Sequence, residues 1–284
     1  MSELIDCSTL QTDAGVTLLC GETNSGKTTQ ARTLPKPCLV ITHEAKTRNA
    51  LQGAPGIKLA EFIVQKYELG LQTKSKTEKV LAAFECWESF KSFMYKMRSG
   101  DLWKEYKSVV YDGLTSGQQI HMTHRLEEQG HVGQGPQTGK RDDNDYDAPI
   151  RAMLALCGEF TAISARLNIP FVVIGHRNVL RDLQGNPTEY TLDTYGRSAR
   201  FIPRMVTNSL FLFNRSSANT PKFSALTRTG MTDGAVRVQY ANTAIKRADG
   251  SALPFEIDLT IGDWAKPEEY GLGALLKGQW KESK

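Results

Sequence analysis

The sequence lacks long apolar runs and has few cysteines. No window approaches 18 consecutive apolar residues, and the N-terminus, MSELIDCSTL, has early acidic residues and no basic segment ahead of an apolar one. The five cysteines include no CxxC pair, which argues against a disulfide framework and a structural zinc site. We therefore expect a cytoplasmic protein with reduced core thiols and no membrane partner.

The net charge of the chain is also small. The chain has 35 Lys and Arg against 31 Asp and Glu, and this net charge of +4 is too small to identify a polyanion partner. The surplus is local, because residues 177–247 carry 11 basic side chains and four acidic ones. A hydrophobic fraction of 40% excludes wholesale disorder.

What is present is an alternation of short β-branched runs with helical patterns, which is typical of βαβ units. Continuous apolar runs, as in parallel strands covered on both faces, lie at residues 16–20, 38–42, 108–112, 171–175 and 210–213. Apolar stripes predict helices within 80–97 and 150–167. Alternating segments at 222–227, 235–241 and 254–261 predict antiparallel strands that extend the sheet. The expected fold class is therefore α/β, with a mainly parallel sheet flanked by helices.

Two long polar stretches interrupt this pattern. Residues 113–147 are rich in Gly, Gln and Asp and suggest a long loop, or a loop with one short helix. Residues 177–196 suggest a second long loop. Each follows the carboxyl end of a predicted central strand, where open α/β sheets bind ligands, so we expect both stretches to be functional or mobile.

A phosphate-binding motif, GxxxxGK[ST], stands between a predicted buried strand and a helix. It consists of Gly21, Glu22, Thr23, Asn24, Ser25, Gly26, Lys27 and Thr28, and Thr29 follows. Its backbone N–H groups are expected to surround a di- or triphosphate. We expect Lys27 to reach the β- and γ-phosphates and Thr28 to ligate Mg²⁺. The alternative is a Gly-rich turn with an exposed lysine.

Polar residues at other strand ends complete the expected site. Asp112 ends an apolar run that we expect beside the P-loop strand, so it is the candidate Walker-B carboxylate and is expected to meet magnesium through water. The alternative is that Asp112 only starts a turn. Glu44 is placed to activate water, with His43 as its rival and a surface glutamate as the alternative. His176 is placed to sense the γ-phosphate, or is a structural histidine.

Other ligands are less well supported. The guanine-specific motif N-K-x-D is absent, which favours ATP over GTP. His121, His124 and His131 raise the question of zinc, but no cysteine pattern accompanies them.

With these residues in place, the chain resembles the RecA-like P-loop ATPases, and among them the phage-encoded AAA-type nucleotide-binding proteins of single-strand annealing and recombination. The resemblance covers roughly residues 14–262 and rests on the P-loop with the strand leading to Glu44, on Tyr111-Asp112-Gly113, and on Val173-Ile174-Gly175-His176. It implies a single ATPase domain over 1–284, with a core of about 14–262 and a C-terminal tail of 263–284. It also implies ATP and Mg²⁺ as cofactors.

The resemblance further implies that the two polar stretches are DNA-binding loops. Candidate contacts to single-stranded DNA are Arg177, Arg181, Arg197, Arg200 and Arg204, with the aromatic residues Tyr190, Tyr195 and Phe201 between them. Alternatively, these arginines pair with nearby acids on a solvated loop. Lys246 and Arg247 are similar to trans-acting fingers, or are two solvated cations. A homo-oligomeric ring or filament, a single-strand-binding protein as partner, and the host cytoplasm as location are implied.

The chain departs from the family in the position of His43 and in the acidic end of the first polar stretch. These departures bear on strand exchange more than on ATP binding. A DNA-dependent ATPase is therefore the leading hypothesis. The alternatives are a helicase-like motor or helicase loader, a small-molecule kinase, and a non-hydrolysing nucleotide switch.

Overall fold

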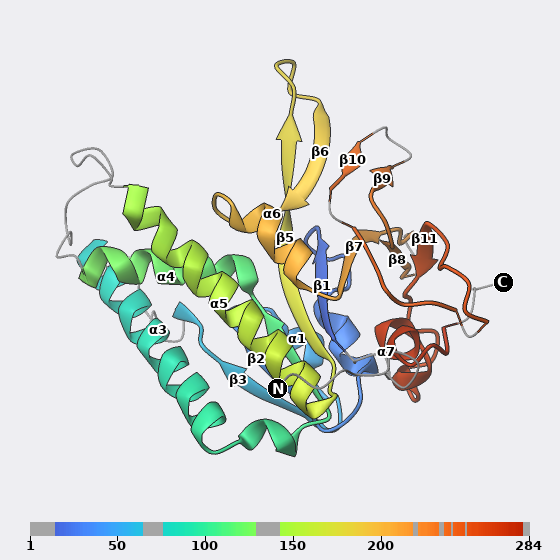
Figure 1. The fold of residues 1–284 in the computed structure, drawn as a ribbon, viewed down its shortest axis with the longest axis horizontal. Coiled ribbons are helices and arrows are strands. Elements are labelled where there is room, and N and C mark those ends of the chain that lie inside the picture. The colour runs from blue at the N-terminus through green and yellow to red at the C-terminus, as the bar shows by residue number, and fades with distance from the viewer. Residues whose placement is uncertain are drawn as a thin grey trace, which may run out of the picture.

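Strands of continuous apolar sequence form a mixed sheet at the centre of the structure (Figure 1). The computed structural model describes residues 15–64, 76–128, 143–217, 221–232, 236–239, 241–247 and 249–280. Within these residues the main sheet has the order β11-β8-β7-β1-β5-β4-β2-β3. Its parallel strands are β1 (Val16–Gly21), β2 (Cys38–Thr42), β3 (Ile57–Glu61), β4 (Ser108–Asp112), β5 (Phe171–Arg181) and β7 (Asn208–Asn214). The predicted fold class is confirmed.

Helices cover both faces of this sheet, as the continuous apolar strands require. They are η1 (Thr28–Thr33), α1 (Thr47–Leu51), α3 (Lys76–Ser99), η3 (Leu102–Glu105), α4 (Leu114–Glu128), α5 (Asp143–Leu167), α6 (Ser198–Met205), η4 (Pro267–Glu269) and α7 (Gly271–Leu276). Successive strand residues alternate between faces. Leu18 packs in the cluster that contains Trp87 of α3 and Phe160 of α5, whereas Leu19 packs with Leu272 of α7. No helix in the described ranges is both long and apolar enough to cross a membrane.

The described residues of the first polar stretch are helical, so the expectation of a loop with at most one short helix is wrong for them. Helix α4 starts two residues after Asp112, and α5 already begins at Asp143. Residues 129–142, with His131 among them, lie outside the described part of the chain. The buried side chains of α4 include the polar residues Thr115, Gln118, His121 and His124. Because this buried face is polar, the sequence shows no apolar stripe there.

The second polar stretch is mainly a β-hairpin, so the expectation of a loop over 177–196 is also wrong. Strand β5 continues to Arg181 and pairs antiparallel with β6 (Pro187–Leu192). Asp182 Oδ1 accepts the backbone N–H groups of Gln184 and Asn186, at 2.9 and 2.8 Å, within the turn. The hairpin stands out from the sheet (Figure 1), and Leu183 at its end is fully exposed. A hairpin so exposed has little buried surface and gives no apolar pattern.

The antiparallel edge agrees with the sequence only in part. Strands β8 (Phe223–Leu226) and β11 (Glu256–Asp258) extend the main sheet antiparallel, as expected. The segment 235–241 contains only β10 (Arg237–Val238), which pairs parallel to β6 and antiparallel to β9 (Gly230–Met231), away from the main path. The segment therefore belongs to the eleven-stranded sheet, but it branches off through β6 instead of extending the edge next to β8 and β11.

The order of the central strands also differs from the expectation. The strand that ends at Asp112, β4, does not lie beside the P-loop strand β1, because β5 is inserted between them. Strand β5 comes later in the chain than either neighbour, so strand order along the sequence did not reveal its place. Strand β3 was not expected, because its side chains are only partly buried or exposed.

The C-terminal segment is packed against the helix that follows the P-loop. The Gln30 side chain of η1 donates to Leu259 O at 2.9 Å and accepts the N–H of Leu272 at 2.8 Å. Gly273 N donates to Thr33 Oγ1 at 2.9 Å. Where we expected a tail from residue 263, α7 is therefore part of the packed structure.

This packing predicts that Gly273→Ala is strongly destabilising. A Cβ atom at Gly273 would lie 1.8 Å from Thr33 O, so the backbone of α7 or η1 must move. We expect the free energy of unfolding, measured with urea, to fall by about 3 kcal/mol. Gly158→Ala in α5 is the control, because its Cβ would meet only Met205 Cε at 3.8 Å. An unchanged stability for Gly273→Ala would contradict the close contact between α7 and η1.

Candidate nucleotide-binding site

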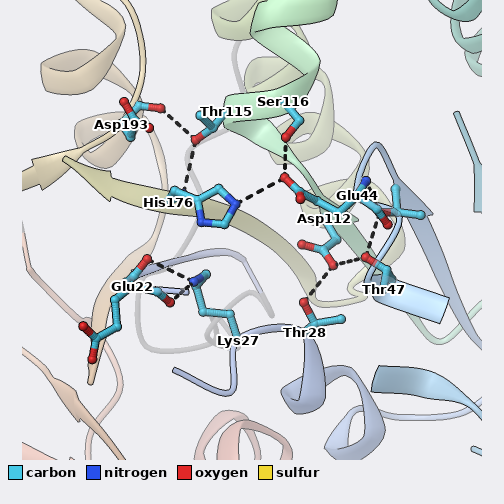
Figure 2. Close-up of polar contacts among 12 residues, drawn as sticks. Glu22, Lys27, Thr28, Glu44, Thr47, Asp112, Thr115, Ser116, His176 and Asp193 are labelled. Carbon is cyan, nitrogen blue, oxygen red and sulfur yellow. Dashed lines mark hydrogen bonds and ion pairs between the residues drawn. The ribbon is translucent and has the colours of Figure 1, made fainter. Parts of the chain in front are cut away.

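The carboxyl ends of the central strands meet along one edge of the sheet. Gly21 of β1 is in register with His176 of β5, and Thr42 of β2 is in register with Asp112 of β4. Ligands of open α/β sheets bind outside such strand ends. The structure therefore brings the P-loop motif, Glu44, Asp112 and His176 to one edge, although they are far apart in sequence (Figure 2).

A cavity of about 480 Å³ lies at this edge. Residues 23–29 of the motif line one side, and Glu44, Asp112 and His176 line the other. Its volume is in the range of small-molecule sites. The residues predicted from the motif and from the strand ends therefore border one common space.

The motif has the backbone conformation of a tight, ligand-facing loop. Asn24 and Gly26 have positive φ angles of 63° and 80°, and a Cβ atom at Gly26 would lie 2.8 Å from the Phe223 ring. Glycine is therefore required at position 26. The Lys27 ammonium lies 3.0 Å from Gly21 O and 2.5 Å from Glu22 O, so it is bound by carbonyls of its own loop. Burial lowers the pKa of Lys27.

Thr28 and Asp112 are in direct contact. Thr28 Oγ1 donates to Asp112 Oδ2 at 2.8 Å, and Thr47 Oγ1 donates to the same oxygen at 2.6 Å (Figure 2). Burial raises the pKa of the Asp112 carboxyl, whereas these hydrogen bonds lower it. A buried carboxylate beside a hydroxyl fits Mg²⁺, which prefers oxygen ligands and retains several waters. Burial also favours a cation here, because a cation offsets the cost of the buried charge.

Glu44 is held by side chains from two other elements. Its Oε1 accepts a hydrogen bond from Ser116 of α4 and lies 3.2 Å from His176 Nε2 (Figure 2). The hydrogen bond from His176 is the largest cause that lowers the pKa of Glu44, and burial opposes it. Glu44 is thus an ionised, oriented carboxylate at the edge of the cavity.

His43, the rival of Glu44, is turned into the core. It is only 5% exposed, and its Nδ1 lies 2.8 Å from Phe62 O. Its ring stacks near Trp87 and meets Phe90 edge-on at a centroid distance of 5.0 Å. Burial lowers the pKa of His43 to about 4, so the ring is neutral at pH 7. His43 does not line the 480 Å³ cavity.

With this geometry established, the chain can be set beside known proteins. No protein-family model matches it, and no curated protein matches it. Among solved structures, it is similar to a KaiC-like protein from the hyperthermophilic archaeon Pyrococcus horikoshii OT3. The two are 12% identical, with a TM-score of 0.40, over 90% of this chain and 88% of that one. A similarity this low assigns no function to the chain.

The arginines predicted to bind DNA are not on a common loop. Arg177 lies at the base of the hairpin, where its guanidinium contacts Glu22 at 2.7 Å and covers the Tyr190 ring at 4.5 Å. Tyr190 in turn packs near Phe211. Both side chains are engaged within the protein, which argues against Arg177 as a phosphate contact and Tyr190 as a stacking platform. Arg181 is on the exposed hairpin and donates to Gly185 O at 2.7 Å.

The other predicted DNA contacts gather at α6. Arg197, Arg200 and Arg204 are exposed, and Arg197 lies 3.4 Å from Asp147. Tyr195 and Phe201 are 42% and 43% exposed on the same segment. Exposed arginines interleaved with exposed aromatic rings suit a single-stranded nucleic acid.

The proposed finger lies away from the cavity of its own chain. Lys246 forms an isolated β-bridge with Ala252, and Arg247 N donates to Ser251 O at 2.9 Å in the adjoining turn. Neither residue lines the 480 Å³ cavity. A role in the nucleotide site therefore requires a second copy of the chain.

His121, His124 and the four described cysteines are buried among other side chains. His121 and His124 of α4 stack 5.7 Å apart between ring centroids, and His124 Nε2 lies 2.8 Å from Glu88. In the described part of the chain, no group of three or more His, Cys, Asp and Glu is arranged to hold a metal. Burial raises the pKa of Cys20, Cys86 and Cys157 to about 12, so these free thiols are protonated.

Sequence reasoning missed Thr47 and Ser116. Each is a hydroxyl residue a few positions after a strand that ends at the site, and that position was the only available signal. Motif spacing does not identify such residues, because their roles depend on contacts with Asp112 and Glu44 across the sheet edge.

Proposed function

We propose that the protein binds ATP with Mg²⁺ and hydrolyses it, as a P-loop ATPase with a RecA-like core. The proposal rests on the 2.8 Å hydrogen bond from Thr28 to Asp112, which joins the P-loop to the Walker-B strand at a cavity that Glu44 also lines. ATP is favoured over GTP because N-K-x-D is absent from the sequence.

Each residue has a defined part in this proposal. Residues 21–29 surround the phosphates, and Lys27 leaves its loop carbonyls for the β- and γ-phosphate oxygens. Thr28 and Asp112 would hold Mg²⁺, which when bound would supply positive charge that neutralises the phosphates. Glu44 takes a proton from the attacking water, whose oxygen bonds to the γ-phosphorus as the ADP oxygen leaves. His176 keeps Glu44 ionised and oriented.

The proposal extends to single-stranded DNA bound at α6. Helix α4 connects the two sites. Ser116 contacts Glu44, while Gln118, two residues later, accepts Tyr195 N–H at 2.7 Å and donates to Ser198 Oγ at 3.2 Å. Thr115 adds a bond of 2.7 Å to Asp193 O. DNA contact at α6 therefore has a short route of hydrogen bonds to the water-activating glutamate.

In the wider proposal, the protein acts in phage-type recombination or single-strand annealing in the host cytoplasm. Copies of the chain assemble into a ring or filament, so that Lys246 or Arg247 of one copy reaches the phosphates of the next. A single-strand-binding protein is a further proposed partner. The exposure of Lys246 supports this use across an interface.

A second cavity supports one alternative. About 710 Å³ in volume, it adjoins the first and shares Thr23, Glu44, Lys46 and His176 with it. His43 and two polar residues of α4, Ser116 and Gln119, also line it. Such a space beside the γ-phosphate position would suit a kinase with a small-molecule acceptor. Release of inorganic phosphate with no added acceptor would favour hydrolysis.

The central test is phosphate release with and without single-stranded DNA at two salt concentrations. We expect DNA to stimulate turnover and to bind more weakly as salt rises. Phe201→Ala should weaken DNA binding by about tenfold, because stacking of a base on an aromatic ring is worth roughly 1–3 kcal/mol. Arg200→Ala should reduce the slope of log affinity against log salt by about 0.7, the loss of one phosphate contact.

Arg166→Ala is the matched control for these variants. Arg166 is an exposed arginine on α5 that lies 3.0 Å from Asp101, and it should leave DNA affinity and its salt dependence unchanged. If DNA neither binds in a salt-sensitive manner nor stimulates phosphate release, the DNA-dependent part of the proposal is wrong. ATP hydrolysis without DNA would still support the ATPase part.

A further inference from the structure

A chain of buried hydroxyl groups links Asp112 to the backbone of Glu44. Thr47 Oγ1 donates to Asp112 Oδ2 at 2.6 Å, and Thr42 Oγ1 lies 2.9 Å from Thr47 Oγ1. Glu44 N in turn lies 2.8 Å from Thr42 Oγ1. The side chains of Thr42 and Thr47 belong to residues that are at most 1% exposed. Neither threonine belongs to the P-loop, and neither carries a carboxylate as Glu44 and Asp112 do.

Proton counting gives this chain one direction. An ionised carboxylate can only accept, so the single hydroxyl proton of Thr47 goes to Asp112. The oxygen of Thr47 is then left to accept, and the hydroxyl proton of Thr42 goes to it at 2.9 Å in preference to Glu44 O at 3.3 Å. The oxygen of Thr42 accepts the N–H of Glu44. Every member therefore has a partner, as a buried polar network requires.

The network makes Asp112 and Glu44 one structural unit. Ser116 and His176 contact the Glu44 carboxylate, whereas Thr42 Oγ1 accepts the backbone N–H of Glu44. Figure 2 shows Thr47 beside Asp112. Asp112 Oδ2 is shared between Thr28 on the P-loop side and Thr47 on the Glu44 side. Thr47 is thus the only residue in this chain of contacts that touches both Asp112 and the support of Glu44.

We propose that Thr47 is a positioning residue, which sets the magnesium-binding Asp112 and the water-activating Glu44 in register through Thr42. The inference rests on the proposed function, since it assigns Thr47 a role in that site. Outer contacts of this kind that orient metal-binding groups are worth about 10–100-fold in metal affinity or activity. Loss of the Thr47 hydroxyl leaves Asp112 Oδ2 with one donor fewer, and it leaves Thr42 Oγ1 only the more distant Glu44 O, at 3.3 Å, as an acceptor.

The test compares Thr47→Val, which keeps the shape but removes the hydroxyl, with Thr47→Ser, which keeps the hydroxyl. Binding of a fluorescent ADP analogue is titrated with Mg²⁺ and, separately, measured in EDTA, and kcat for ATP is measured in parallel. For Thr47→Val we expect the half-saturating Mg²⁺ concentration to rise and kcat to fall, each by about tenfold or more. Affinity in EDTA should be unchanged, and Thr47→Ser should restore both values to within about threefold of wild type.

Two further variants separate positioning from general stability. Thr42→Val removes the support of Glu44 but leaves the Thr47 hydroxyl bonded to Asp112, so kcat should fall while the Mg²⁺ titration keeps its wild-type midpoint. Thr161→Val is the matched control, because Thr161 bonds only within α5, to Cys157 O at 2.9 Å, and should change neither value. A merely structural Thr47 would lower thermal stability and weaken binding equally with and without Mg²⁺.

The outcomes distinguish this inference from the proposed function. If wild type binds nucleotide in a Mg²⁺-dependent manner and Thr47→Val does the same with an unchanged midpoint and kcat, the role of Thr47 is wrong and the ATPase proposal stands. If wild type does not bind Mg²⁺ and ADP together, both are overturned. If Thr47→Val yields no folded protein, Thr47→Ser and Thr42→Val decide, and wild-type kcat for Thr42→Val would refute the link to Glu44.

Discussion

Lys27→Ala should lose nucleotide binding while remaining folded. The proposed site asks the Lys27 ammonium to exchange its contacts with Gly21 O and Glu22 O for phosphate oxygens. Hydrogen bonds to charged groups are worth about 1.5–3 kcal/mol each, so the loss of two should weaken ATP binding by roughly 100-fold or more. Titration calorimetry with ATP and Mg²⁺ measures the affinity. Phosphate release should fall to background at ATP concentrations that saturate wild type.

The stability of this variant is part of the prediction. Burial lowers the pKa of Lys27, so without nucleotide the buried ammonium is a cost that alanine removes. We therefore expect Tm to be unchanged or higher, which would separate lost binding from unfolding. Lys58→Ala is the control, since Lys58 is exposed on β3 and covers Tyr106 at 5.5 Å, away from the cavity. Wild-type ATP affinity in Lys27→Ala would overturn the assignment of the cavity.

The sequence predicts the parallel strands well, because strands that are buried on both faces appear as continuous apolar runs. Strands β2 and β4 begin and end as predicted, since every residue of both is buried. The helices within 80–97 and 150–167 are likewise confirmed, because aromatic and aliphatic side chains repeat along their buried faces. Sequence patterns reveal the helices and strands whose buried apolar side chains recur at a regular spacing.

The same reasoning explains which elements were mispredicted. Helix α4 buries the polar residues Gln118 and His124, and the β5–β6 hairpin buries few side chains. Both segments therefore lack an apolar pattern, and the sequence predicts loops there. The insertion of β5 between β1 and β4 depends on pairing between segments far apart in the chain, which no local pattern encodes.

At the site, the sequence predicts the residues that belong to a motif or follow a strand end. It does not predict residues whose role depends on a contact with a distant part of the chain. The P-loop, Asp112 and His176 follow from strand ends and motif spacing, and the structure gathers them at one cavity. Arg177 illustrates the limit. Its positive charge suggested DNA, but its guanidinium faces Glu22 and Tyr190. Charge counting along a sequence does not distinguish an arginine that binds a partner from one that binds its own fold.

Glu44→Gln should abolish most hydrolysis and keep ATP binding. Glutamine retains an oxygen that can accept from Ser116 and His176, but it cannot take a proton from water. General-base catalysis contributes about 10²–10⁴-fold, so kcat should fall by that amount while ATP affinity stays within about threefold of wild type. Glu61→Gln is the matched control, because Glu61 ends the neighbouring strand β3 and pairs with exposed Arg48. Unchanged kcat in Glu44→Gln would show that another group activates water.

The pH dependence of kcat provides a second, independent test of Glu44. A general base works when deprotonated, so activity is present above its pKa and is lost as pH falls through it. In wild type the hydrogen bond from His176 lowers the pKa of Glu44 below its usual 4.5, so kcat should not respond to this group between about pH 6 and 8. His176→Ala removes the largest cause of that lowering and leaves burial, which raises the pKa. The acid limb should therefore move to higher pH in His176→Ala and vanish in Glu44→Gln. An acid limb in the same place in all three proteins would mean that Glu44 is not the titrating base.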